Sequence, residues 1–143
     1  MSFRYNYLDD VALADAAFEV WSDSWGGLFA GATEAMTNVM VSVADLNESR
    51  AHPLTINAGS VGELLYDWLS ELVYLKDTVG LLVKSIDVDV QSGPIWQAHG
   101  ILHGDTIDVK RHRLGQDVKA VTYHLFDVSQ NGQEYKAKIV LDI

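Results

Sequence analysis

The apolar positions of this chain recur with two periods, one typical of helices and one typical of strands. Residues 25–43 and 60–75 each carry apolar side chains at helical spacing. Ser22 or Ser24 can cap the first helix by accepting a hydrogen bond from an unsatisfied N–H group. Ser60 opens a capping-box pattern at the start of the second helix. The pattern therefore predicts two amphipathic helices.

Strand-like runs fill most of the remaining chain. Residues 86–91 alternate apolar and polar side chains, as a half-buried strand does. Asn131-Gly132 separates the last two runs and favours a hairpin. The predicted strands cover residues 3–8, 14–21, 54–56, 86–91, 95–103, 118–128 and 134–142. Residues 99–113 are the least regular region, which we interpret as a loop.

This order of strands and helices predicts an α+β fold. We expect a two-layer sandwich in which two helices pack on one face of a mixed or antiparallel β-sheet. A chain of 143 residues with 48% hydrophobic residues and two prolines is suited to one packed domain, 1–143. No repeat or domain boundary interrupts it.

Composition and charge narrow the possible partners. Twenty acidic residues against ten basic ones give a net charge of −10, which repels phosphate backbones. The one basic run, 110–113, is too short to reverse that field, so we expect no direct nucleic-acid binding. Cysteine is absent, and no segment is apolar enough to span a membrane. The expected location is the cytoplasm, and a basic protein partner would be attracted.

The chain ends on acidic groups. A strand-like run leads into Asp142 and then Ile143, whose carboxylate is the last group. These closely spaced oxygen donors are of the kind that Ca²⁺ or Mg²⁺ requires. His99, His103 and His112 lack a convincing zinc-binding spacing.

Several short motifs together carry a family resemblance. They are Tyr5–Asp9, Ala14-Asp15, Leu64–Leu69, Arg111-His112, Lys119–His124 (KAVTYH) and Val140–Ile143. On these motifs the chain resembles the archease family along nearly its whole length. The resemblance implies a non-enzymatic protein cofactor of the RtcB-type RNA ligase in tRNA splicing and RNA repair. Archeases promote guanylylation of that ligase and so its multiple turnover. They are also associated with a chaperone-like effect on a tRNA methyltransferase.

The resemblance also implies a metal site made of Asp15, Asp142 and Ile143. Ile143 would offer main-chain or terminal carboxylate oxygen, because its side chain has no donor. Ca²⁺ is the expected metal, with Mg²⁺ or Mn²⁺ as alternatives, since an all-oxygen shell selects hard cations. The run Val11–Ala14 departs from the family by lacking a histidine that members often carry before the first aspartate. The plainer interpretation, two solvated acids at strand ends, stays open.

Three further residues are candidates for partner contact or for supporting the metal ligands. They are His124, Lys119 and Asp23. A hydrogen-bonded structural histidine, a solvated lysine and a solvated acidic surface are the alternatives.

Two other functions compete with ligase activation. One is a chaperone-like modulator of a tRNA methyltransferase, in which the metal serves structure alone. The other is an independent Mg²⁺-dependent hydrolase, because carboxylate-bound Mg²⁺ also serves phosphoryl chemistry. The hydrolase is disfavoured because no phosphate-binding loop and no nucleophile motif are present.

Overall fold

The structure is a computed structural model that describes residues 2–9 and 15–143. Its elements follow the predicted succession of strands and helices. They are β1 (Phe3–Leu8), β2 (Asp15–Ser22), α1 (Trp25–Met40), the short 3₁₀ helix η1 (Val43–Asp45), β3 (Arg50–Ala58), α2 (Val61–Val79), β4 (Leu81–Gln91), β5 (Trp96–Thr106), β6 (Ala120–Asn131) and β7 (Glu134–Asp142). The α+β class is confirmed.

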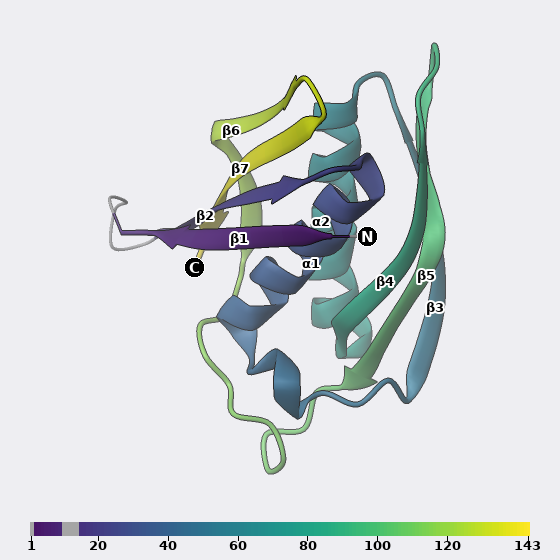
Figure 1. The fold of residues 1–143 in the computed structure, drawn as a ribbon. Coiled ribbons are helices and arrows are strands. Elements are labelled where there is room, and N and C mark those ends of the chain that lie inside the picture. The colour runs from purple at the N-terminus through teal and green to yellow at the C-terminus, as the bar shows by residue number, and fades with distance from the viewer. Residues whose placement is uncertain (1, 10–14) are drawn as a thin grey trace.

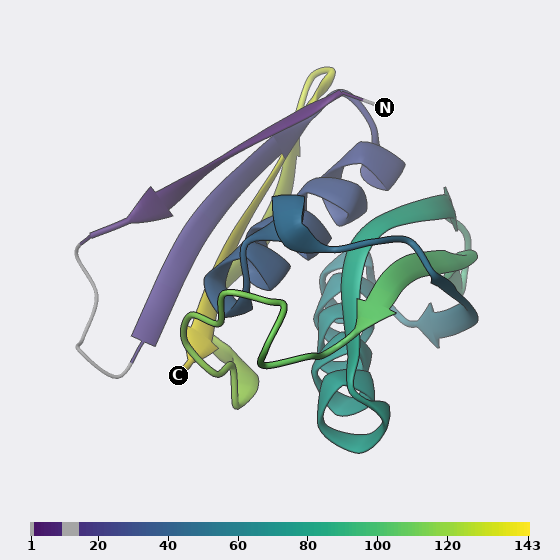
Figure 2. The ribbon, with the colours of Figure 1, turned by 90° about the horizontal axis from the view of Figure 1, so that it is seen from below.

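The strands form two antiparallel sheets with the helices between them (Figure 1, Figure 2). The four-stranded sheet has the order β1-β2-β7-β6, and the three-stranded sheet has the order β3-β5-β4. α1 packs on β1, β2 and β7 of the first sheet and on β4 of the second. α2 packs on all three strands of the second sheet and on β6 of the first. The helices therefore face two sheets, whereas the sequence predicted one sheet that both helices cover from one face.

α1 begins at Trp25, directly after its N-cap residue Ser24. Of the two predicted caps, Ser24 accepts a hydrogen bond from the Gly27 N–H at 3.0 Å, and its own backbone is extended. Gly31 lets the helix approach the sheet closely, because a Cβ atom there would lie 2.7 Å from Val20 Cγ1. This glycine thus serves close packing of α1 against β2.

α2 has a defined cap at each end. Ser60 accepts a hydrogen bond from the Glu63 N–H at 3.2 Å, which confirms the capping interaction at the predicted start. The helix ends at Gly80, whose φ of 66° lies in the left-handed region that glycine adopts readily. On its inner face, Trp68 is fully buried and donates a hydrogen bond from Nε1–H to Thr33 Oγ1 of α1. This bond satisfies the indole N–H inside the core.

The predicted loop at 99–113 is wrong in its first half, because β5 continues through Thr106. Gly100 and Gly104 weaken the strand pattern in the sequence, but both face the neighbouring strand closely. A Cβ atom at either position would collide with backbone carbonyl groups of β4. The irregular segment is therefore 107–119. Among the described residues, no helix combines the length and apolar character needed to cross a membrane.

A buried carboxylate holds the start of that irregular segment. The side chain of Asp105 is 4% exposed and accepts both guanidinium hydrogen bonds of Arg111 at 3.0 Å. His112 Nδ1 accepts the Asp108 N–H at 3.0 Å, so Nε2 carries the proton and donates to Asp105 at 3.3 Å. The Arg111-His112 motif therefore fixes the segment that leads toward β6.

Candidate metal site at the edge of the four-stranded sheet

Asp15 and Asp142 are direct partners in the four-stranded sheet. β2 and β7 pair antiparallel from Ser22 opposite Tyr135 to Asp15 opposite Asp142. Residues directly opposite one another in such a pair have Cβ atoms about 4.5–5.5 Å apart. Figure 2 shows the C-terminus near the start of β2. Two acids from opposite ends of the chain thus form one cross-strand pair.

Strand alternation places both carboxylates on the outer face of the sheet. Phe18 and Val20 of β2 and Ile139 and Leu141 of β7 are fully buried against the helices. Since side chains alternate between faces, the odd positions of β2 and the even positions of β7 point outward. The aspartates are half-buried there. The carboxylates can therefore be reached from solvent, while their backbone is anchored by core residues.

A third strand and the last residue lie beside the Asp15–Asp142 pair. We call the part of the sheet edge formed by Asp15, Asp142 and Ile143 the metal corner. Ala120 of β6 pairs with Asp142, and the Lys119 N–H donates to the Asp142 carbonyl oxygen at 2.8 Å. The Ile143 side chain packs partly against the core. Its main-chain oxygen is thereby held next to Asp142. Lys119 is the one of the three supporting candidates that the structure brings to this corner.

A buried lysine fixes the segment that enters β6. Lys76 of α2 has a side chain that is 7% exposed, and its ammonium donates to the Val118 carbonyl oxygen at 2.9 Å and to the carboxylate of Asp117. Burial by itself would lower the pKa of Lys76. The hydrogen bonds to Asp117 and Asp77 outweigh that effect and raise it. Lys76 is therefore charged at neutral pH and ties α2 to the residue before Lys119.

His124 lies further along β6 and does not pair with Asp142. The register shifts between Thr122 and Asp127, so His124 sits in a bulge and is exposed. Its carbonyl oxygen accepts a hydrogen bond from Thr122 Oγ1 at 3.5 Å.

Asp23 lies at the opposite end of β2. Eight residues separate it from Asp15, and a rise of about 3.3 Å per residue places it roughly 25 Å away. Asp23 is therefore too far from Asp15 and Asp142 to contact them directly.

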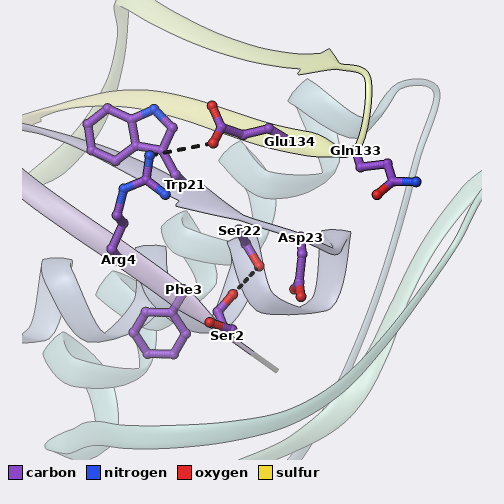
Figure 3. A pocket seen from close by; sticks show the side chains of 8 residues that line it. All are labelled: Ser2, Phe3, Arg4, Trp21, Ser22, Asp23, Gln133 and Glu134. Carbon is purple, nitrogen blue, oxygen red and sulfur yellow. Dashed lines mark hydrogen bonds and ion pairs between the residues drawn. The ribbon is translucent and has the colours of Figure 1, made fainter.

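Asp23 instead lines a separate shallow pocket of about 210 Å³ (Figure 3). Arg4 contacts Glu134 at 3.5 Å there and lies over the Trp21 ring at 4.9 Å. Both charged side chains are mostly exposed. The charges of Arg4 and Glu134 are therefore mutually paired at the surface.

The donor set at the Asp15–Asp142 pair is composed of oxygen atoms. Within residues 2–9 and 15–143, no further histidine, aspartate or glutamate side chain joins the two aspartates to form a group of three. Two carboxylates and main-chain oxygen atoms suit Ca²⁺ or Mg²⁺, with water completing the shell, and do not suit Zn²⁺. Like charges directly opposite one another destabilise a strand pair, and a bound dication would remove that repulsion. The residues present therefore fit a hard divalent cation. The altered run Val11–Ala14 and Asp10 lie outside the described residues.

Among the described residues, His99, His103 and His112 do not come together as the ligands of one metal ion. His99 Nδ1 lies 2.6 Å from Thr55 Oγ1, and His103 Nε2 lies 2.8 Å from Asp87 Oδ2, both on the outer face of the three-stranded sheet. His112 is buried elsewhere, beside Asp105.

Two residues with structural roles escaped the sequence reasoning. Asp105 belongs to none of the motifs named above. The one signal that could have found it is its spacing, six residues before Arg111, which suggests an ion pair. Lys76 looked like an ordinary helix-surface lysine. Its position on the buried side of α2 follows from helical spacing to Leu72 and Leu69, which are also buried.

The fold and the corner define a small α+β class: two antiparallel sheets around two helices, with an acidic strand pair at one sheet edge. A sequence profile described as "Archease protein family (MTH1598/TM1083)" matches residues 5–143. The chain therefore belongs to the archease family.

Named relatives and solved structures agree with that assignment. Protein archease of Methanopyrus kandleri is 30% identical over 131 residues, covering 91% of this chain and 94% of the relative. Protein archease of Archaeoglobus fulgidus is 31% identical over 140 residues, covering 98% and 99%. The solution structure of Methanobacterium thermoautotrophicum protein 1598 superposes with a TM-score of 0.82 at 26% identity, covering 97% and 98%. A crystal structure described as an archease, possible chaperone, from Thermotoga maritima has a TM-score of 0.60 at 19% identity, covering 92% and 93%, and supports the fold alone.

Proposed function

We propose that this chain is a metal-dependent activator of an RtcB-type RNA ligase, acting in tRNA splicing and RNA repair. In this role it promotes guanylylation of the ligase and thereby its multiple turnover, without being an enzyme itself. The observation that carries the proposal is the cross-strand pair of Asp15 and Asp142 in a member of the archease family.

The side chains of Asp15 and Asp142 and the main-chain oxygen of Ile143 would hold the cation, with Ca²⁺ as the expected metal. When bound, such a cation supplies positive charge that can bind phosphate oxygens and stabilise charge developing on them. The chain itself supplies rigidity, because β2 and β7 are the central strands of their sheet. A preorganised corner of this kind presents its groups to a partner with little cost in ordering.

Action on the ligase protein, and not on RNA directly, is supported by the charge of the chain. A net charge of −10 repels RNA phosphates and attracts a basic protein surface. An accessory protein accelerates its partner's chemistry if it binds the reactive conformation more tightly than the resting one. Differential binding of that conformation is the mechanism we propose.

Replacing Asp15 or Asp142 with asparagine tests the proposal. Asparagine keeps the size of the side chain but removes the charge that a dication requires. In single-turnover guanylylation of the cognate ligase, we expect each variant to lose stimulation by at least tenfold. Calcium titration calorimetry should show weaker binding in the same variants. The matched control is Asp23→Asn, which removes one acid at the far end of β2 and should retain full stimulation.

Other results would assign a different function. Full stimulation by both aspartate variants, or by protein treated with chelator, would refute the metal-dependent mechanism. Suppressed aggregation of a tRNA methyltransferase without faster guanylylation would favour the chaperone-like role, which the description of the Thermotoga maritima relative suggests. Turnover of RNA or nucleotide by the purified chain alone would favour the Mg²⁺-dependent hydrolase.

A further inference from the structure

β6 is an edge strand that lies beside α2. In the strand order β1-β2-β7-β6, β7 is the only described strand that pairs with β6. Edge strands present backbone N–H and C=O groups to which a further strand can bind. A groove of about 260 Å³ separates this edge from the helix. Its lining includes Tyr66, Ser70, Tyr74, Asp77, Lys119 and Ala120.

A bulge follows the part of the edge that borders the groove. Between Thr122 and Asp127 the register with β7 shifts, so Tyr123–Phe126 leave the regular ladder. Leu125 has a φ of 57°, a backbone conformation that leucine rarely adopts. Tyr123 and Leu125 are 66% and 55% exposed. The strained bulge therefore presents apolar side chains to solvent next to Ala120–Thr122.

The facing side of α2 is acidic and aromatic. It includes Tyr66, Tyr74 and Asp77, which line the groove, and Glu63 and Asp67, whose charges act on Tyr123 of β6. The one basic residue of this helix, Lys76, is buried and paired with Asp77 and Asp117. Lys119 is the basic residue that borders the groove. Carboxylates thus outnumber free ammonium groups on this surface.

Aromatic rings and carboxylates meet at one place on it. Tyr66 stacks on Tyr123 with ring centroids 3.9 Å apart and planes 10° apart. Partial desolvation, followed by the neighbouring Tyr66 and the negative charges of Asp67 and Glu63, raises the pKa of Tyr123. Both carboxylates therefore lie close enough to act on the Tyr123 hydroxyl. An arginine guanidinium matches such a surface, because it stacks on aromatic faces and pairs with carboxylates.

We propose that the α2–β6 groove binds an extended, arginine-bearing segment of a protein partner. The segment adds to the free edge of β6 at Ala120–Thr122, and its arginine side chains contact the tyrosines and carboxylates of α2. Strand addition of this kind takes affinity from main-chain hydrogen bonds and specificity from side chains in neighbouring pockets. Phosphate-bearing ligands are repelled by the same carboxylates.

The groove is continuous with the metal corner, since the Lys119 N–H binds the Asp142 carbonyl oxygen. A segment bound at Ala120–Thr122 would bring its protein next to Asp15 and Asp142. With the ligase as partner, this inference rests on the proposed function and gives it a docking surface.

The test compares how the double variant Asp67→Lys/Tyr74→Ala and the wild type stimulate guanylylation of the purified cognate ligase over a range of concentrations. Both side chains are exposed, so the fold should be kept, which circular dichroism checks. We expect the concentration for half-maximal stimulation to rise at least tenfold, with an unchanged plateau. Hydrogen exchange should slow at residues 119–123 of the wild type when ligase is added. Asp89→Lys, the same charge change on the outer face of the other sheet, is the control, and its half-maximal concentration should change far less than that of the double variant.

The outcomes separate this inference from the proposed function. Stimulation by the double variant that coincides with wild type would overturn the groove and leave the activator role intact. An equal loss in Asp89→Lys would also overturn it, because the effect would then come from overall charge. Absence of any stimulation by the wild type would refute the activator role, and with it the ligase as occupant.

Discussion

The buried carboxylate of Asp105 holds several segments of the chain together through hydrogen bonds. Besides Arg111 and His112, its carboxylate accepts backbone N–H groups of Asn47 and Thr106, each at 2.9 Å. These bonds join the segment after η1, the end of β5 and the segment 107–119. The Arg111 hydrogen bonds are the main cause that lowers the pKa of Asp105 well below its usual range, against the opposing effect of burial.

We expect Asp105→Asn to lower the free energy of unfolding by about 2 to 3 kcal/mol, because it leaves the Arg111 charge without its partner. Urea denaturation at pH 7 measures the loss. Asp45→Asn is the matched control, since Asp45 pairs with Arg113 at the surface, where the arginine side chain is 80% exposed. That control should lose much less stability. Equal losses in the two variants would contradict the assigned role of Asp105.

The stabilisation from Asp105 should also depend on pH in one direction. A lowered folded pKa means that the contribution is complete above the unfolded carboxyl value of about 3.9 and is lost as the pH falls toward the folded value. The stability difference between wild type and Asp105→Asn should therefore be constant from pH 7 to about 5 and shrink below pH 4. A difference that grows on acidification would contradict the assigned direction.

The helices were the most predictable elements, because their signals are local. Ser24 and Ser60 cap the helices at predicted positions, and the apolar stripe of α2 is the one found in the core. Strand ends were less predictable where pairing overrides local preference. β3 runs from Arg50 to Ala58, well beyond the predicted 54–56, because β5 supplies a partner along its whole length. No local pattern in the sequence encodes that partner.

The two ends of α2 should respond oppositely to the same substitution. Gly62→Ala should raise the free energy of unfolding by up to about 1 kcal/mol, because the first turn has space for a Cβ atom and alanine favours helix. Gly80→Ala should lower it by about 1 kcal/mol, because its φ of 66° disfavours any Cβ atom. Chemical denaturation of both variants measures the signs. Stabilisation by Gly80→Ala would contradict the left-handed cap.

At the scale of the whole molecule, the sequence did not predict the division into two sheets. The alternation of apolar and polar residues in one strand does not indicate which other strands pair with it. One clue was present in α1, where Glu34 is the single charged residue of the helix. Thr33, Thr37 and Ala35 are buried together with the predicted apolar stripe, since a sheet lies on each side. A helix that is apolar nearly all round is typical of a buried one. The pairing of Asp15 with Asp142 likewise came from motif resemblance, because no local rule joins residues so far apart in sequence.

The net charge of −10 should control how fast the molecule meets a basic partner. Long-range attraction raises the association rate and is screened by salt, since the Debye length falls from about 10 Å at 0.1 M to about 3 Å at 1 M. We expect the association rate constant with the cognate ligase, measured by stopped-flow fluorescence, to fall roughly tenfold between 0.05 and 0.5 M NaCl. The dissociation rate should change much less, because it reflects short-range contacts. A double variant that replaces two exposed acids of the other sheet, Asp87→Asn and Asp89→Asn, should weaken the salt dependence without changing dissociation. Association that is independent of salt would mean that short-range docking, and not the overall field, limits the encounter.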